Sequence, residues 1–171
     1  MASPAKFAHV VYRSGRLAEM CDWYCTVLEA HVAFKNDFIA FLTYDDEHHR
    51  VAIVDAGATD QPSPTTRGVE HVAFTYASLD DLVDTYERLK DLGVEPYWSI
   101  NHGPTTSCYY RDPDGNQVEL QIDNFESTDA LNAWFRSGAF AENPIGVEFD
   151  PDELVAKFHA GTPREELVRR P

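Results

Sequence analysis

The sequence predicts an α+β fold of two βαβββ modules in a pseudo-two-fold arrangement that form one cupped mixed sheet, followed by a helical tail. Three observations predict it. The chain repeats itself without a gap, so that His9 falls on His71 and Tyr24 on Tyr86. In each copy an apolar strand precedes an amphipathic helix and three short strand-like segments. After Phe125, helix-start signals replace this pattern.

The length of 171 residues fits one domain, for which ~100–200 residues are typical. A module of about 60 residues is marginally stable by itself. We therefore expect the two copies to share one core. We place modules 7–56 and 69–123 in a single domain spanning 1–126, and a helical extension at 127–171.

In the first module, apolar residues recur at intervals of three and four positions from Leu17 to Leu28, which predicts a helix. Turn residues at 35–37 and 44–47 separate the strands that follow. A stretch from 57 to 68, rich in Pro, Thr and Asp, is the predicted loop between the modules. The predicted strands are Phe7–Tyr12, His31–Lys35, Phe38–Tyr44 and Arg50–Val54.

In the second module, the helix is predicted from Leu79 to Leu89, with Ser78 as its N-cap and Gly93 just past its end. Pro and Gly in the segment 112–116 indicate a tight turn. The predicted strands are Val69–Tyr76, Glu95–Ile100, Thr106–Arg111 and Gln117–Ile122.

The tail carries three helix signals. A short helix is expected at Asp129–Phe135. Asp150, with proline at the next position, predicts the start of a second helix. Thr162, with Glu165 three residues later, resembles a capping box and predicts a third. We expect the tail to cover an edge of the core or a partner subunit.

Composition excludes several classes of protein. The 14 Lys and Arg against 29 Asp and Glu give a net charge of −15. Nucleic acid and anionic membrane surfaces attract basic proteins, so neither is an expected partner. We see no apolar run long enough for a membrane span and no signal-peptide core. Three cysteines, an odd number, do not form a disulfide framework, and the cytoplasm is the expected compartment.

The repeat also suggests a site. Taken alone, His9 and His71 are ordinary structural or surface histidines, but they occupy matched positions on matched strands. Glu119 alternates with Val118 and Leu120, so it lies either on a solvent-facing surface or inside a concave sheet. An inward carboxylate needs a cation partner.

The position in the first module that matches Glu119 is Ala52, so a symmetric fourth ligand is missing. Two imidazoles and one carboxylate leave half of an octahedral shell open. That ligand set is typical of non-haem Fe(II) oxygenases, whose open positions take substrate and O₂.

A third motif is more specific. It holds His102, then Tyr109, then the turn Asp112-Pro113-Asp114-Gly115, then Glu119. It resembles the signature of the type I extradiol ring-cleavage dioxygenases, which belong to the vicinal-oxygen-chelate superfamily together with glyoxalase I. Cys108 stands where the signature usually has an aliphatic residue, a small apolar exchange.

A fourth motif, His48-His49 after an acidic turn and before an apolar strand, also resembles these dioxygenases. The resemblance covers residues 7–123 and implies the small one-domain form of the enzyme. It implies that His49 is the acid–base catalyst, that Tyr109 hydrogen-bonds a substrate oxygen, and that His102 lines the substrate pocket.

The resemblance further implies that Fe(II) is held by His9, His71 and Glu119, with a catechol-type aromatic diol as substrate and O₂ as co-substrate. The same ligands also bind Mn(II). Because such domains often pair, we expect a homo-oligomer. Two alternatives remain at this stage: a glyoxalase-like metal-dependent lyase or isomerase, and a metal-free binding protein of the bleomycin-resistance type.

Overall fold

The computed structural model describes residues 2–63, 65 and 67–170. Met1, Pro64, Thr66 and Pro171, which fall in the predicted start, loop and tail, lie outside the described residues. The chain divides into two compact units. The first comprises residues 1–68 together with 112–116, and the second comprises 69–111 together with 117–171. Of the helices that the structure describes, none is long and apolar enough to cross a membrane.

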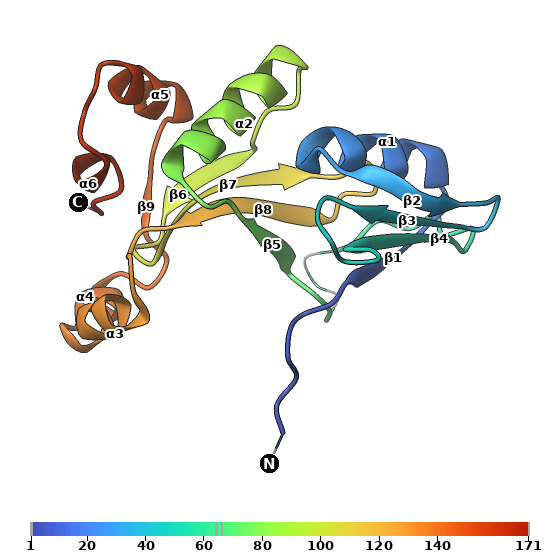
Figure 1. Cartoon of the computed structure of the whole chain (residues 1–171), viewed down its shortest axis with the longest axis horizontal. Helices are drawn as coiled ribbons and strands as arrows, with labels where there is room; N and C mark the ends of the chain where they lie inside the picture. Colours follow the sequence, from blue (N-terminus) through green and yellow to red (C-terminus); the bar gives the residue numbers. More distant parts are fainter. Residues whose placement is uncertain (1, 64, 66, 171) are drawn as a thin grey trace. The chain divides into compact units, whose positions relative to one another are not determined.

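The first unit is a four-stranded sheet with one long helix. Its strand order is β1-β4-β3-β2, with β1 and β4 parallel and the other pairs antiparallel. Helix α1 lies along one face of this sheet (Figure 1) and buries Met20, Tyr24 and Val27 completely. The elements are β1 (Val10–Ser14), α1 (Leu17–Leu28), β2 (His31–Lys35), β3 (Ile39–Thr43) and β4 (Val51–Asp55).

Strand β1 begins later than the predicted Phe7. The side chain of Arg50 donates hydrogen bonds to the backbone carbonyls of Phe7 and Ala8, at 2.8 and 3.2 Å. These carbonyls therefore bind a guanidinium group instead of a neighbouring strand. The backbone N–H of Val10 then bonds the Arg50 carbonyl at 3.0 Å, and the parallel ladder with β4 starts there.

The second unit contains the matching elements and one more strand. Its sheet has the order β5-β8-β7-β6-β9, and β5 and β8 are parallel. The hydroxyl of Ser78 accepts the backbone N–H of Asp81, and Gly93 follows the helix at φ 74°, so both predicted helix ends are confirmed. The elements are β5 (His71–Thr75), α2 (Leu79–Asp91), β6 (Trp98–Asn101), β7 (Thr105–Arg111) and β8 (Gln117–Asp123).

The two sheets share one register, which confirms the repeat. In the first, Val11 pairs with Ala52. In the second, the matching Ala73 pairs with Glu119. The predicted mixed sheet is thus present as two hydrogen-bonded sheets, one from each module. Ala52 occupies the place of Glu119, as the sequence indicated.

The turn between β7 and β8 packs within the first unit. Asp112 is only 4% exposed and accepts hydrogen bonds from the Tyr24 hydroxyl at 3.1 Å and from the Asn116 side chain at 2.8 Å. Its other oxygen accepts the backbone N–H groups of Asp114 and Asn116. Gly115 has φ 84°, a conformation that favours glycine. Burial raises the pKa of Asp112, against the effect of these donors.

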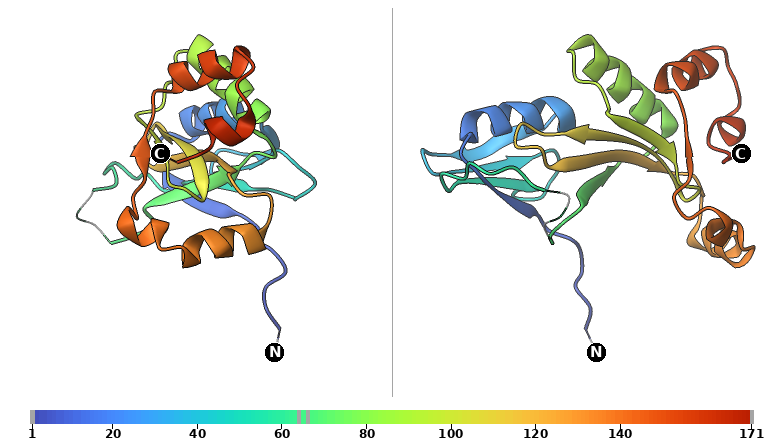
Figure 2. Two further views of the ribbon diagram at one scale, coloured as in Figure 1. Left: turned by 90° about the vertical axis from the view of Figure 1, so that its left-hand side faces the viewer. Right: turned by 180° about the vertical axis from the view of Figure 1, so that it is seen from behind.

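The tail is ordered and includes a strand that the sequence analysis missed. Figure 2 shows β9 beside β6, and the register pairs Asn101 with Val147 in antiparallel fashion. Asp150 caps α5 as predicted, because its carboxylate accepts the N–H groups of Asp152 and Glu153. The elements are α3 (Thr128–Arg136), α4 (Ala139–Glu142), β9 (Val147–Glu148), α5 (Pro151–His159) and α6 (Arg164–Leu167).

The capping box predicted at Thr162 is wrong. Pro163 is the N-cap residue of α6, and no side chain caps this helix. The proline holds the chain in an extended conformation one residue later than the box requires.

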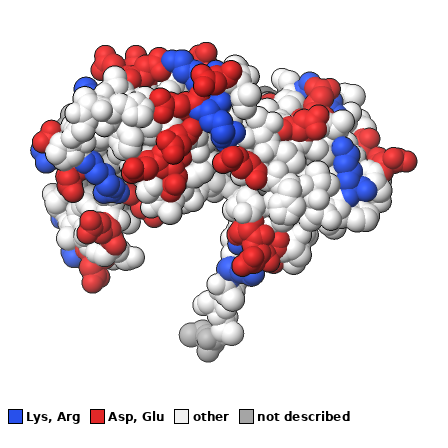
Figure 3. Space-filling view, turned by 45° about the horizontal axis from the view of Figure 1, so that its top comes forward, with Lys and Arg blue, Asp and Glu red and all other residues white. Residues whose placement is uncertain are grey.

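The surface is acidic, in keeping with the composition. On the face drawn in Figure 3, Asp and Glu side chains are spread widely and basic side chains lie among them. One basic side chain, Arg50, binds Asp45 with its guanidinium at 2.8 Å.

Candidate metal and catalytic site

The second unit brings His71 and Glu119 together. His71 starts β5, and Glu119 lies in β8 on the neighbouring parallel strand, two positions beyond the residue that pairs with His71. The His71 Nε2 atom lies 3.0 Å from a Glu119 carboxylate oxygen. Glu119 is 4% exposed, so the solvent-facing alternative for this residue is wrong. A buried carboxylate requires a cation or several hydrogen-bond donors beside it.

Tyr109 is placed against the same carboxylate. The register of β7 and β8 pairs Tyr109 with Glu119, so the two side chains lie next to each other on the same face of the sheet. The Tyr109 ring meets the His71 ring edge-on, with 5.4 Å between centroids. Burial, followed by the charge of Glu119, raises the pKa of Tyr109. The hydroxyl is therefore a hydrogen-bond donor at neutral pH.

His102 completes this group in the second unit. It follows β6, and its Nε2 atom lies 3.0 Å from the Tyr109 hydroxyl. The indole ring of Trp98 packs near both residues, 4.8 Å from the Tyr109 ring and 5.8 Å from the His102 ring by centroids. Three sequence-predicted residues, Glu119, Tyr109 and His102, thus lie together, with Tyr109 between the other two.

The first unit forms a separate cluster of three histidines. The ring of His9 lies 4.2 Å from that of His49 and 6.1 Å from that of His48, by centroids. The Nδ1 atoms of His48 and His49 are 2.6 Å apart, so one of them carries the proton and donates it to the other. One nitrogen from each of the three rings lies within 4.8 Å of the others.

His49 differs from its neighbour His48 in burial. His49 is 8% exposed, whereas the His48 side chain is 66% exposed. The His49 ring stacks on Phe41 of β3, with 4.3 Å between centroids and 9° between planes. Burial first, and then the nearby rings of His9 and His48, lower the pKa of His49. A neutral imidazole at physiological pH can accept a proton, which suits a general base.

The sequence identified the polar side chains of both clusters but not the aromatic rings and the backbone carbonyl that contact them. Phe41 lies within the predicted strand Phe38–Tyr44, and nothing in the sequence placed its ring against His49. Trp98 lies within the predicted strand Glu95–Ile100, and nothing in the sequence placed its ring beside His102. The backbone carbonyl of Ile145, which bonds His102, has no sequence signal, because every residue carries such a group.

The donor set of the second unit fits a divalent metal ion. One imidazole nitrogen and one buried carboxylate oxygen lie side by side, and both are ligand types that iron and manganese accept. His9 belongs to the first unit, while His71 and Glu119 belong to the second. The joint role of the three residues as ligands stays a prediction.

Comparison with known proteins identifies the family. The model of the "Glyoxalase/Bleomycin resistance protein/Dioxygenase superfamily" matches residues 6–120. The chain belongs to this superfamily. The solved structure of a glyoxylase/bleomycin resistance protein/dioxygenase domain from Frankia sp. EAN1pec superposes with a TM-score of 0.58 at 23% identity, and covers 71% of this chain and 99% of that one. This likeness supports the fold.

Two curated relatives narrow the assignment. The chain is 48% identical to "Biphenyl-2,3-diol 1,2-dioxygenase 2" of Rhodococcus globerulus over 98% of this chain and 89% of the relative. It is 43% identical to "Biphenyl-2,3-diol 1,2-dioxygenase 3" of the same organism over 99% and 90%. The resemblance to the extradiol ring-cleavage dioxygenases, inferred from the motifs, is confirmed.

Proposed function

We propose that this superfamily member uses Fe(II) and O₂ to cleave a catechol-type ring beside the diol, and that it accepts aryl-substituted catechols such as biphenyl-2,3-diol. The observation that carries the proposal is the 3.0 Å contact between the His71 imidazole and the buried Glu119 carboxylate, with Tyr109 paired beside that carboxylate. The substrate class comes from the two Rhodococcus relatives, whose names specify biphenyl-2,3-diol.

In this proposal His9, His71 and Glu119 hold the metal ion. His9 is included because the shared register makes it the repeat counterpart of His71. Ala52 at the counterpart of Glu119 leaves three protein ligands, whereas glyoxalase-like lyases and isomerases generally use four. When bound, Fe(II) supplies Lewis acidity and brings O₂ and the diol into reaction. The same ligand types accept Mn(II).

The remaining residues handle protons and position the substrate. His49 accepts a proton from a catechol hydroxyl at a ring nitrogen, because its lowered pKa keeps it neutral beforehand. The Tyr109 hydroxyl hydrogen-bonds a substrate oxygen, and His102 orients Tyr109 through their 3.0 Å contact. The flat face of Trp98 beside these two residues offers a stacking surface for an aryl ring.

The overall reaction incorporates both atoms of O₂. The carbon–carbon bond next to the diol breaks, and the ring opens to a yellow hydroxymuconic semialdehyde-type product. The proton that His49 accepts from the diol is returned during ring opening, so the chain ends each cycle unchanged.

Oxygen uptake tests the proposal. The protein is loaded anaerobically with Fe(II) and mixed with a panel from catechol to biphenyl-2,3-diol. We expect uptake with a yellow product, faster for the aryl-substituted diols, and abolished by His71→Ala. His31→Ala, in the exposed strand β2, is the matched control and should keep full activity. Tight iron binding with no uptake across the panel would contradict the proposal and favour a glyoxalase-like lyase or isomerase.

A further inference from the structure

We propose that the C-terminal tail is part of the active site: its backbone fixes one tautomer of His102, and Arg170 is the positioning residue that holds it there. The inference rests on the proposed function for the role of His102 in catalysis. The geometry that carries it lies entirely within the second unit and is independent of any metal ion.

Both ring nitrogens of His102 have a defined partner. The Nδ1 atom contacts the backbone carbonyl of Ile145, and the Nε2 atom lies 3.0 Å from the Tyr109 hydroxyl. A carbonyl oxygen only accepts hydrogen bonds, so the Nδ1 atom must carry the proton. In the neutral ring the Nε2 atom is then an acceptor that faces Tyr109. The Ile145 carbonyl therefore leaves the unprotonated Nε2 atom of His102 facing Tyr109.

The Ile145 carbonyl is held in place by a tight turn. The side-chain oxygen of Asn143 accepts the N–H groups of Ile145 and Gly146, at 3.2 and 2.9 Å. The Asn143 amide donates to the Gly146 carbonyl at 2.7 Å. A Cβ atom on Gly146 would lie 2.4 Å from the Asn101 carbonyl oxygen, so the close approach of the tail to β6 requires glycine here. The pairing of β9 with β6 continues this contact.

Arg170 ties three backbone segments together. Its guanidinium donates to the carbonyls of His102 at 3.2 Å, Asn143 at 2.7 Å and Ala139 at 2.5 Å. The planar group also lies over the indole of Trp134, 5.0 Å from the centroid. One side chain thus connects His102, the Asn143 turn that holds the Ile145 carbonyl, and the start of α4.

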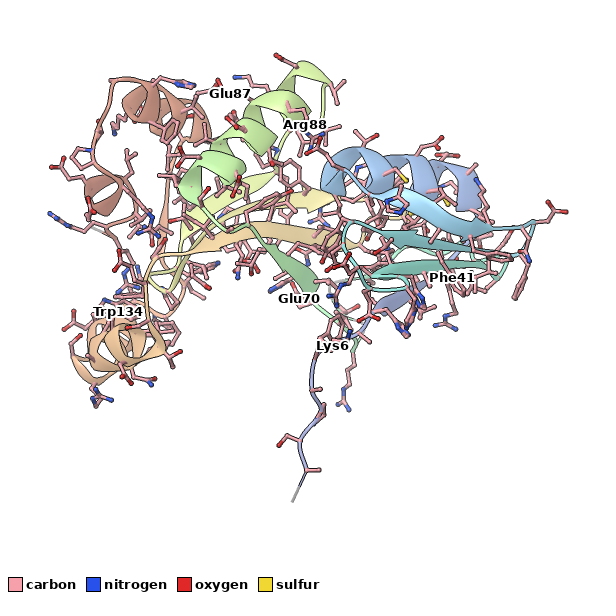
Figure 4. The ribbon with its side chains drawn as sticks, in the orientation of Figure 1. Lys6, Phe41, Glu70, Glu87, Arg88 and Trp134 are labelled. Atoms are coloured by element: carbon pink, nitrogen blue, oxygen red, sulfur yellow. The ribbon has the colours of Figure 1, made fainter. Side chains whose placement is uncertain are left out.

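Trp134 of α3, labelled in Figure 4, packs between the Arg170 guanidinium and Gly103 in the loop after β6. A Cβ atom on Gly103 would lie 2.3 Å from the Trp134 ring, and Gly103 has φ 101°. The glycine next to His102 therefore has both a steric and a conformational reason to be glycine.

The tail buries few side chains completely, and Val168, just after α6, is the described tail residue that belongs to the core. Among the described residues of α3, α4, α5 and α6, none is buried. A segment that served only to cover the sheet would be expected to bury apolar side chains against it. Here several of the tail's polar contacts converge on the segment 101–103, including a 2.9 Å bond from the Asn101 amide to the Val168 carbonyl.

The test compares Arg170→Ala with Arg169→Ala in the full chain. Arg169 is exposed, and among the described residues it makes no hydrogen bond or ion pair, so it is a matched control. The first readout is the tautomer of His102, measured by ¹⁵N NMR of the histidine rings in the metal-free protein and assigned by loss of the signal in His102→Gln. We expect the Nδ1-protonated form in the parent and in Arg169→Ala, and a mixture of tautomers in Arg170→Ala.

The second readout is steady-state kinetics with the best catechol of the panel. Loss of the partner that orients His102, and through it Tyr109, should lower kcat about 10- to 100-fold in Arg170→Ala, with a smaller change in KM. Arg170→Lys should recover little, because one ammonium cannot match the planar fork that reaches three carbonyls. If Arg170→Ala does not fold, Asn143→Ala, which releases the Ile145 turn, takes its place.

An unchanged tautomer in Arg170→Ala, or a changed tautomer with unchanged kcat, would overturn the inference. The tautomer measurement needs no substrate or iron. If the parent protein cleaves no catechol, the proposed function fails, while the NMR result still decides whether the tail controls His102.

Discussion

The two modules share a fold and a strand register but differ in their outer edges and their polar residues. The first pairs Val11 with Ala52, and its edge strand β2 is exposed along its whole length. The second pairs Ala73 with Glu119, and its strand β6 is covered by β9. The two copies therefore carry different polar residues on one scaffold: the first holds the histidine cluster, and the second holds Glu119 and the added tail. The difference shows that a repeated frame can place a different set of polar groups in each half.

The largest expected effect comes from removing the charge at Glu119, the register position where the two halves differ most. Glu119→Gln keeps the shape of the side chain but removes its charge. Changing an outer-sphere partner of a metal ligand typically costs 10- to 100-fold in metal affinity or activity. For the ligand itself we expect iron affinity to fall by at least about 100-fold and activity to fall to background.

Iron content after gel filtration and oxygen uptake measure this effect. Asp123→Asn, at the exposed end of the same face of β8, is the control. Full iron content in Glu119→Gln would contradict the assignment of Glu119 as a ligand.

A second prediction separates the two neighbouring histidines of the first module. His49→Ala should lower kcat by about 10²- to 10⁴-fold, the usual contribution of a general acid–base group, with iron retained. His48→Ala should have a much smaller effect, because its side chain is largely exposed. Steady-state kinetics on iron-loaded variants decides this. Equal losses in the two variants would show that the buried His49 has no special role.

Sequence reasoning placed most of the fold because the repeat and the apolar spacing are local signals. Strand His31–Lys35 and the cap at Ser78 were predicted as they occur. The sequence could not say whether the face of β8 that carries Glu119 points to solvent or inward. The burial of Glu119 in the structure shows that it points inward. Strand β9 was missed because two residues, Val147 and Glu148, carry no periodicity.

The third prediction concerns the turn that packs with the first module. Tyr24→Phe removes the hydroxyl that donates to buried Asp112. Leaving a buried acceptor with one fewer donor costs about 1–3 kcal/mol in the free energy of unfolding. For a chain of this size, that loss lowers Tm by roughly 2–10 °C. Calorimetry measures it, and an unchanged Tm would mean that this bond does not hold the turn.

The smallest expected effect is a pH dependence at the same place. Burial raises the pKa of Asp112 in the folded chain above its unfolded value. Between these two values the folded state binds more protons, so this group makes stability fall as pH rises and has no further effect above the folded pKa. Asp112→Asn should lack this contribution. Denaturant unfolding of both proteins from about pH 4 to 7 tests it, and parallel curves would contradict it.

The central proposal is that His9 and His71 are both iron ligands. Anaerobic Fe(II) titration of the parent, His9→Ala, His71→Ala and the control His31→Ala tests it most directly. We predict a single tight iron per chain in the parent and in the control, and loss of tight binding in either ligand variant. Full, tight iron binding by His9→Ala would contradict the account, because the metal site would then belong to the second module alone.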